Sequence, residues 1–327
     1  QVESGKSVLG LFDFQQSTSV QRTFATMNDA TDDDTQLFAK TPAGAWTEIA
    51  AAETDWNGTA NMNVEMEQFI GYCFFVGWGS VDGFLDVGSV TNTTWSTATN
   101  VTNMAQGKYI VRFRDRLYVG NSRSGGTDYP YRVYFSSVPS AGAITWTPAT
   151  DFVDFDYGLE ITGMHATRAR LYVFTRDATW YYDQSTRDKL WDYGCSNHRT
   201  IKSFGPYIIW CTGNDVVMMT GGHPQSIGGE VIDFIKNGNP LNYFSAIVDK
   251  EYWMYVGNPT VNGIAYTNCC LVYNFGTDSW RVRELANTMT IFARYFDSTL
   301  GDQRLYMGDS SGQVWDKSKY TDSTRAS

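Results

Sequence analysis

The sequence predicts an all-β fold built from one repeated strand unit. The first observation is composition. Of the 327 residues, 15% are aromatic and 18% charged, and runs rich in Val, Ile, Tyr, Phe and Thr are broken by Gly, Asp, Asn or Ser. This composition is typical of half-buried strands joined by tight turns. The second observation is a unit that occurs twice between Lys108 and Tyr182, where Arg116–Val119 and Arg170–Val173 occupy equivalent places.

The unit recurs along the whole chain with a period that predicts a β-propeller. When Leu117 marks the second strand of its unit, equivalent apolar positions follow at intervals that average about 47 residues, near the 40–50-residue period of four-stranded blades. These positions are Phe24, Phe74, Leu117, Leu171, Ile208, Met254 and Leu305. We therefore predict seven four-stranded blades, with six blades as the alternative.

The predicted propeller covers residues 1–318, and a polar C-terminal tail covers residues 319–327. The blades are expected near residues 7–50, 64–100, 108–150, 160–192, 199–236, 243–285 and 289–318. In the first blade the strands are expected at Val8–Phe14, Arg22–Asn28, Thr35–Lys40 and Ala45–Ile49. In the second they are expected at Val64–Ile70, Cys73–Gly79, Gly83–Gly88 and Thr93–Thr99.

The remaining blades are read in the same way. The third opens with Lys108–Asn121, continues with Tyr131–Val138 and closes with Ile144–Thr150, and the fourth contains Glu160–Asp177 and Thr179–Gln184. The fifth contains Arg199–Gly205, Tyr207–Gly213 and Val216–Gly222, with Glu230–Ile235 as an outer strand or a short helix. The last two contain Tyr243–Asn258, Cys270–Phe275, Ser279–Glu284, Met289–Phe296, Arg304–Asp309 and Gln313–Ser318.

A tryptophan recurs at the start of the predicted outer strands. The four positions are Trp46, Trp95, Trp146 and Trp280. Because their placement is regular and a large flat side chain buries much area, we expect them to pack one sheet on the next. A platform for stacking sugars is the alternative.

The sequence alone does not determine how the last blade closes the ring. The seventh unit has no clear fourth strand, and the only spare segment at the other end is Gln1–Lys6, which is short and polar. A propeller often closes by borrowing a strand from the opposite end of the chain, so this segment is the candidate.

Charge and cysteine usage exclude several classes. The formal net charge is −10 and Lys and Arg are not clustered, which argues against a protein that grips nucleic acid through its phosphates. No apolar run approaches the roughly 18 residues needed to span a bilayer. The five cysteines lack CxxC spacing and mostly fall in predicted strands, so buried thiols are expected, with a disulfide or metal site as the alternative.

No catalytic, cofactor-binding or metal-ligating residue is predicted. The acidic run 29–34 lacks the EF-hand pattern and is expected to be a solvated turn, with a loose cation site as the alternative. His165, His198 and His223 are dispersed without an HExxH pair, and Gly221–Gly229 lacks the GK[ST] ending of a phosphate loop, so it is expected to be a connection. Gly308–Trp315 resembles a sialidase box but has the wrong spacing, and a hairpin turn is expected there.

Three stretches carry a resemblance to a known family: Arg116–Tyr182, LVYNFGTDSWRVRE at Leu271–Glu284 and RLYMGDSSGQVWD at Arg304–Asp316. Over roughly Val64 to Trp315, the chain resembles the β-propeller of bacteriophage tail proteins, in particular the tail nozzle or packaged-DNA-stabilising hub of short-tailed phages. The resemblance implies a non-enzymatic virion protein that forms a ring of copies, possibly a hexamer, around the DNA exit channel. The implied partners are adaptor or portal proteins, tail fibres and passing genomic DNA, which is not bound sequence-specifically.

The acidic balance suits such a channel, because a negative lumen repels DNA phosphates. Two other functions stay open. One is a carbohydrate-binding or glycan-degrading propeller on a virion or cell surface, which would need aromatic and carboxylate side chains clustered at one mouth. The other is an extracellular or periplasmic scaffold propeller of cellular origin.

Overall fold

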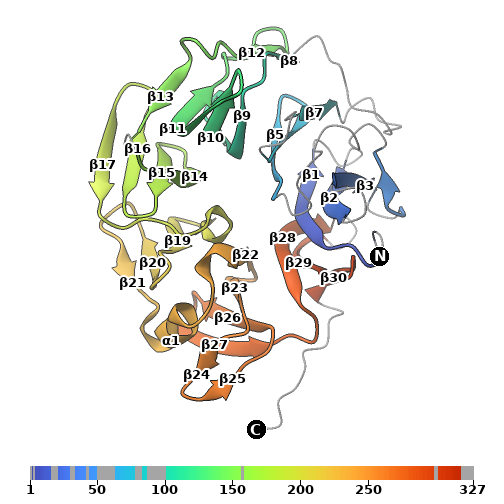
Figure 1. Cartoon of the computed structure of the whole chain (residues 1–327), viewed down its shortest axis with the longest axis vertical. Helices are drawn as coiled ribbons and strands as arrows, with labels where there is room; N and C mark the ends of the chain where they lie inside the picture. Colours follow the sequence, from blue (N-terminus) through green and yellow to red (C-terminus); the bar gives the residue numbers. More distant parts are fainter. Residues whose placement is uncertain are drawn as a thin grey trace.

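Successive hairpins pair the strands into antiparallel sheets that follow one another around a ring (Figure 1). The computed structural model describes residues 2, 4–15, 21–29, 34–41, 44–49, 63–77, 83–86, 101–155, 158–297 and 301–317. Within these ranges there are five meander sheets of four strands and two of three. The prediction of an all-β propeller is therefore confirmed.

The first four sheets lie between Val8 and Trp191. The first contains β1 (Val8–Gln15), β2 (Gln21–Asp29), β3 (Asp34–Lys40) and β4 (Thr47–Glu48), and the second contains β5 (Glu65–Phe69), β6 (Tyr72–Val76) and β7 (Gly83–Asp86). The third contains β9 (Gln106–Phe113), β10 (Arg116–Ser124), β11 (Thr127–Phe135) and β13 (Phe152–Asp154). The fourth contains β14 (Ile161–Ala166), β15 (Leu171–Thr175), β16 (Thr179–Tyr182) and β17 (Arg187–Trp191).

Three sheets complete the ring. The fifth contains β18 (Lys202–Phe204), β19 (Tyr207–Cys211), β20 (Val216–Met219) and β21 (Gln225–Ser226). The sixth contains β22 (Phe244–Val248), β23 (Glu251–Gly257), β26 (Cys269–Asn274) and β27 (Ser279–Glu284). The seventh contains β28 (Met289–Asp297), β29 (Asp302–Asp309) and β30 (Val314–Asp316).

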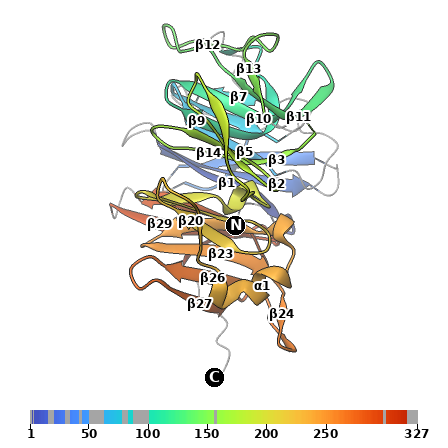
Figure 2. The same cartoon turned by 90° about the vertical axis from the view of Figure 1, so that its left-hand side faces the viewer.

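A few short elements lie outside these sheets. One is a parallel pair of β8 (Val101–Thr102) and β12 (Ile144–Thr145), and another is a hairpin of β24 (Thr260–Val261) and β25 (Ile264–Ala265). The helical turns are η2 (His198–Thr200), η3 (Gly229–Val231), α1 (Ile232–Lys236) and η4 (Pro240–Asn242). Figure 2 places the β12 end and the β24–β25 hairpin at opposite ends of the molecule.

The first strands of the sheets meet around a common axis. β1 contacts β5, β5 contacts β9 and β9 contacts β14, while β18 contacts β22, β22 contacts β28 and β28 contacts β1. η2 joins the two arcs, because it contacts both β14 and β22. The seven repeat positions marked by Leu117 all lie on the second strand of a sheet, and all are buried. The period in the sequence therefore located the strand that packs on both neighbouring sheets.

Two predicted outer strands are wrong. In the third sheet the outer strand is β13, whereas Ile144–Thr145 pairs with β8 outside the sheet. In the fifth sheet the outer strand is β21, which lies within the segment Gly221–Gly229 that was expected to be a connection. The expected outer element 230–235 is helical, which was the stated alternative. The second sheet has three strands in the described residues, and its predicted fourth strand, Thr93–Thr99, lies outside them. The seventh sheet has three strands, in line with the absence of a clear fourth strand in its sequence unit.

The recurrent tryptophans pack between sheets as expected. Trp46 packs on residues of the first and seventh sheets, and Trp146 is buried among residues of the second and third. Trp280 packs between the fifth and sixth sheets and donates its Nε1–H to the Ile227 carbonyl at 2.6 Å. Trp95 lies outside the described residues. The cysteines also behave as predicted, since all five are free and buried.

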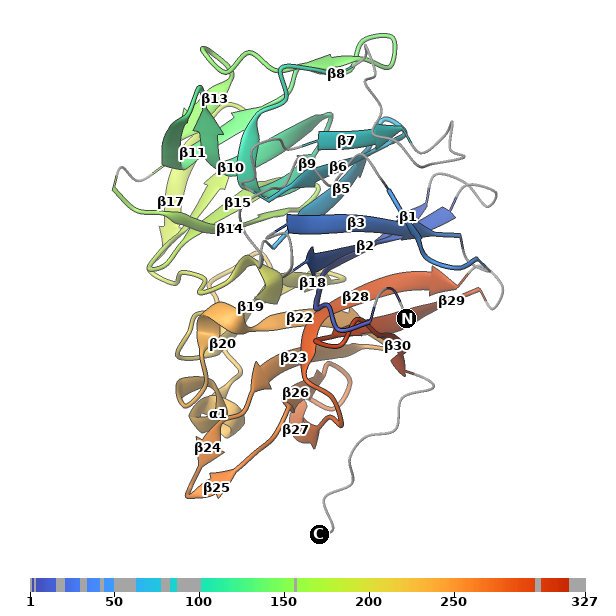
Figure 3. The same ribbon diagram turned by 45° about the vertical axis from the view of Figure 1, so that its right-hand side comes forward.

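In the described residues, no strand from one end of the chain joins the sheet at the other end. The N–H groups of Val2 and Gly5 donate to the carbonyls of Gly312 and Ser311, at 2.9 and 3.1 Å, so the N-terminal segment lies beside the β29–β30 turn (Figure 3). Val8 on β1 and Ile291 on β28 share one apolar cluster behind this contact. The two ends of the chain are therefore joined by a few backbone hydrogen bonds and by packing between the first strands.

The β29–β30 turn is organised by Asp309, in the segment that was predicted to be a hairpin turn. Its Oδ1 accepts hydrogen bonds from the N–H groups of Ser311 and Gln313, at 2.8 and 2.9 Å, and its Oδ2 accepts one from Trp315 Nε1 at 2.8 Å. Burial raises the pKa of Asp309, but these hydrogen bonds outweigh burial and hold it below its usual value. The ionised carboxylate is thus the form that the folded chain favours.

We expect Asp309→Asn to lower the free energy of unfolding by about 1–3 kcal/mol at neutral pH, because charge-assisted hydrogen bonds to a buried carboxylate are lost. The folded-state pKa lies below the unfolded value of about 3.9. The advantage of the wild type is therefore complete above that value and disappears as the pH falls through the folded-state pKa. Urea unfolding of both proteins across pH measures this difference. The exposed Asp177→Asn is the control, and an equal loss there would contradict the role of the turn.

Candidate functional site

The first strands enclose a cavity of about 420 Å³ on the axis of the propeller. Each of β1, β5, β9, β14, β18, β22 and β28 contributes lining residues, and η2 contributes two. The titratable or charged lining side chains are Asp13, Glu65, Glu67, His165, His198, Arg199, Lys202 and Arg294. Ser203 and Arg294 are also exposed, so the cavity reaches the protein surface. This axial cavity is the first candidate site.

An ion pair between Glu65 and Arg199 forms the buried part of this cavity. Arg199 Nε donates to Glu65 Oε1 at 3.1 Å, and one of its terminal nitrogens donates to the Leu9 carbonyl at 2.6 Å. Burial raises the pKa of Glu65, but the positive charges around it outweigh burial and keep it below its usual value. One guanidinium thereby connects the first, second and fifth sheets.

Two histidines face the cavity from neighbouring elements. His198 Nδ1 accepts the Met164 N–H at 3.2 Å, which leaves the hydrogen of the neutral ring on Nε2, 3.8 Å from Glu65 Oε2. Its ring also packs on Tyr109, with the centroids 4.8 Å apart. Burial lowers the pKa of both His198 and His165 to about 4, so both rings are neutral at pH 7.

Two further groups have pKa values near neutrality. Burial raises the pKa of Glu67 to about 7, although its carboxylate accepts the N–H groups of Gln68 and Arg112 at 3.0 and 3.2 Å. Burial lowers the pKa of Lys202 to about 8. The charge of the cavity therefore changes between about pH 6 and pH 9.

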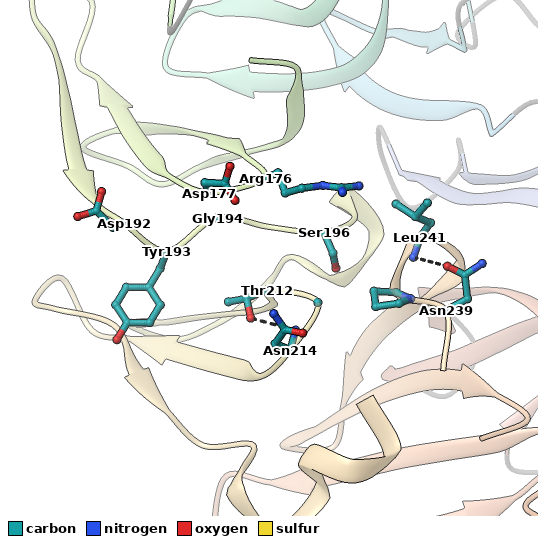
Figure 4. Close-up of a pocket in the computed structure, with 12 residues that line it drawn as sticks. Arg176, Asp177, Asp192, Tyr193, Gly194, Ser196, Thr212, Asn214, Asn239 and Leu241 are labelled. Carbon is teal, nitrogen blue, oxygen red and sulfur yellow. Dashed lines mark hydrogen bonds between the residues drawn. The ribbon is translucent and has the colours of Figure 1, made fainter. Parts of the chain in front are cut away.

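A second, lateral pocket of about 580 Å³ lies between the fourth, fifth and sixth sheets (Figure 4). It is formed by the turn after β15, the connection from β17 to β18, the turn after β19 and the segment at η4. Its lining residues include the polar side chains Arg176, Asp177, Asp192, Tyr193, Asn214 and Asn239. Tyr193 is 38% exposed, and its ring meets His223 edge to face at 5.5 Å.

Gly194 fixes the floor of this lateral pocket. Its carbonyl accepts the Trp210 Nε1–H at 2.9 Å, and a Cβ at this position would lie 1.9 Å from the Arg176 carbonyl oxygen. Since real Cβ contacts are never this short, a larger residue must displace the backbone of the turn after β15. Glycine is thus required here by close approach of two backbone segments.

We expect Gly194→Ala to lower the free energy of unfolding by about 1–3 kcal/mol, because overpacking against backbone forces a shift. Gly222→Ala is the matched control, since a Cβ there meets nothing within 4 Å, and it should change stability by no more than about 0.5 kcal/mol. Guanidinium unfolding of both variants measures the difference. Equal stabilities would show that the turn relaxes without cost.

The structure brings together only some of the residues that the sequence singled out. His165 and His198 meet at the axial cavity, whereas His223 lies apart beside Tyr193 and Trp191. The middle of the acidic run 29–34 lies outside the described residues. Among the residues that the structure describes, no group of three or more His, Cys, Asp or Glu side chains is placed to hold a metal ion.

Sequence reasoning missed the charged side chains of the axial cavity. Glu65 and Glu67 alternate along one predicted strand, and Arg199 and Lys202 lie in another, Arg199–Gly205. Alternation of this kind normally marks a solvated face. The signal that could have been used is that these strands open their units and therefore lie next to the axis.

Comparisons with known proteins support the fold alone. No protein-family model matches the chain, and no curated protein sequence is similar to it. Among solved structures, two crystal structures of the extracellular domain of B. thetaiotaomicron BT4673, described as a one component or a hybrid two component system, match 95% of the chain. Their TM-scores are 0.58 and 0.51, with identities of 10% and 11%, and the chain spans 38% of their length.

The CNH domain of AfRom2 matches over 96% of both chains, with a TM-score of 0.51 and 9% identity. These identities are too low to transfer a function. In the described part of the chain, no helix has the length and hydropathy needed to cross a membrane.

Proposed function

We propose that this chain is a non-enzymatic structural protein of a phage virion, a tail nozzle or hub propeller that forms a ring around the DNA exit channel. The observation that carries the proposal is the agreement between the family-like sequence and the blades. Within the stretch Arg116–Tyr182, the equivalent segments Leu117–Val119 and Leu171–Val173 lie on β10 and β15, which are the second strands of adjacent sheets. The stretch that resembles the tail proteins thus runs through β10 to β16, in the third and fourth sheets.

The axis of a single propeller is not the route for DNA in this proposal. Its cavity of about 420 Å³ has the size of a small-molecule site and is crossed by the Glu65–Arg199 ion pair. A duplex must therefore pass between copies, through a channel that several propellers surround. The formal net charge of −10 favours a lumen that does not retain phosphates.

Contacts between copies are proposed at the two ends of the molecule that Figure 2 separates. Ile264 in the β24–β25 hairpin is 47% exposed, and Val138, which follows β11 near β12, is 44% exposed. Different apolar residues at opposite ends suit a head-to-tail contact, which closes into a ring when the rotation permits.

Mass photometry of the purified chain, followed by cryo-EM of the assembly, tests this proposal. We expect particles several-fold heavier than 36.8 kDa with an axial channel. Ile264→Asp should dissociate them, while Leu241→Asp, at an exposed apolar residue of η4 that lines the lateral pocket, should not. A chain that stays monomeric at every concentration tested would contradict a ring formed by this chain.

Binding of glycans at the lateral pocket is the second candidate function. Tyr193 gives the pocket an exposed aromatic side chain, and Asp177, Asp192 and the amides of Asn214 and Asn239 also line it. Such a combination of stacking surface and hydrogen-bonding groups suits a sugar ring. A glycan array probes this function. Tyr193→Ala should abolish a true signal and Tyr181→Ala, on β16 outside the pocket, should retain it.

A further inference from the structure

Two basic side chains in the axial cavity lack a protein partner. Nε2 of His165, on β14, is buried and makes no hydrogen bond with any described residue. Lys202, on β18, makes no ion pair or hydrogen bond within the described chain, because Arg199 binds the nearby carboxylate of Glu65. Both residues line the same cavity. An ammonium group held out of bulk water without a counter-charge is unfavourable unless something else binds it.

The other charges around the cavity supply only part of that counter-charge, because Glu65 acts on Lys202 through its charge but forms its ion pair with Arg199. The charged and titratable groups that line or border it are Asp13 on β1, Glu65 and Glu67 on β5, Tyr109 and Arg112 on β9, His165 on β14, His198 and Arg199 on η2, Lys202 on β18 and Arg294 on β28. Glu65 is paired with Arg199, and Asp13 interacts with Arg294. From β22 the cavity receives Ser245, Ala246 and Ile247 only.

Glu67 is occupied as well, because its oxygens accept two backbone N–H groups. When Glu67 is protonated, the residues that line the cavity have one positive charge in excess, that of Lys202. The volume of about 420 Å³ is more than a small polyatomic ion needs, and the exposed residues Ser203 and Arg294 mark where it meets solvent.

We propose that the axial cavity binds a small oxyanion, from free phosphate or from a compact carboxylate, through the ammonium group of Lys202 and the Nε2–H of His165. The imidazole then takes the tautomer that carries its hydrogen on Nε2 and satisfies an otherwise unpartnered atom. The ion would connect the fourth and fifth sheets at the axis. This site is independent of the tail assignment, since a monomeric propeller would bind the same ion.

The affinity should depend on pH in a defined direction. The pKa of Glu67 is about 7 and that of Lys202 is about 8, both because of burial, while His165 and His198 stay neutral above about pH 4. As the pH rises from 6 to 9, Glu67 gains a negative charge and Lys202 loses its positive charge. Both changes weaken binding of an anion whose own charge is constant across this range, such as acetate, so its affinity falls.

Isothermal titration calorimetry of the full chain with inorganic phosphate, and separately with acetate, tests the site at constant ionic strength near pH 6. We expect Lys202→Met to weaken binding at least about tenfold. Lys236→Met, on α1 away from the cavity, should leave binding unchanged. The tighter of the two probes identifies the source of the oxyanion.

A measurement on the wild type guards against variants that fail to fold. The ring nitrogen signals of His165 should shift in an NMR titration with the tighter probe, while those of His223, on the outside of the ring of sheets, should not. The inference is overturned if neither probe binds, if Lys202→Met and Lys236→Met bind equally well, or if acetate binds more tightly toward pH 9.

Discussion

Replacing Arg199 by methionine is expected to lower the free energy of unfolding by about 3–5 kcal/mol, because it leaves a buried carboxylate without its partner. Arg199 is 8% exposed and donates to Glu65 and to the Leu9 carbonyl. The substitution therefore removes hydrogen bonds that connect the first, second and fifth sheets. The shift in the midpoint of guanidinium unfolding measures this loss of stability, provided that the dependence of the unfolding free energy on denaturant concentration is unchanged.

Two controls separate the ion pair from a general effect of losing an arginine. Arg168→Met removes an exposed guanidinium and should change stability by no more than about 0.5 kcal/mol. The double variant Arg199→Met with Glu65→Gln removes both charges and should recover part of the loss. A double variant as unstable as the sum of the two single ones would show that the charges do not interact.

Trp210→Ala is expected to cost about 3–5 kcal/mol, the range for truncating a large aromatic side chain in a core. Trp210 is fully buried between the fourth and fifth sheets, packs on Phe174 at 5.3 Å and donates to the Gly194 carbonyl. Truncation removes the packing of two adjacent sheets and the partner of a buried carbonyl. Equilibrium unfolding in guanidinium measures the loss.

Trp210→Phe divides this effect into packing and hydrogen bonding. Phenylalanine keeps most of the aromatic ring but lacks the Nε1–H donor to the Gly194 carbonyl. We therefore expect the free energy of unfolding to fall by about 1–2 kcal/mol. Tyr193→Ala, at a partly exposed aromatic of the lateral pocket, should cost less than either. If Trp210→Ala were no worse than Tyr193→Ala, the contact between the fourth and fifth sheets would not depend on this side chain.

The sequence was most informative for positions that are buried in the same place in every sheet. Each second strand is covered on both faces by neighbouring sheets, so an apolar position such as Leu117 or Met254 recurs with the blade period. The tryptophans at 46, 146 and 280 were placed for the same reason, because packing between sheets needs a large apolar side chain at a regular position. The likeness to tail proteins and the virion role remain proposals.

The sequence was least informative for short edge strands. β13 has three residues and β21 has two, too few for an alternating pattern to be seen. Their places are decided by backbone pairing with β11 and β20. Aromatic content favoured Ile144–Thr150 as the outer strand, but Trp146 is buried between sheets without belonging to one.

By itself, the sequence determined the all-β class, the repeated unit, the buried second strands and the buried thiols, because these follow from which residues leave water. Only the tertiary structure decided the axial cavity and the closure of the ring. Glu65 and Arg199 are 134 residues apart, and Val2 bonds to Gly312 at the other end of the chain. Such contacts arise because strands from every unit converge on one axis, and no local pattern encodes which polar groups then meet.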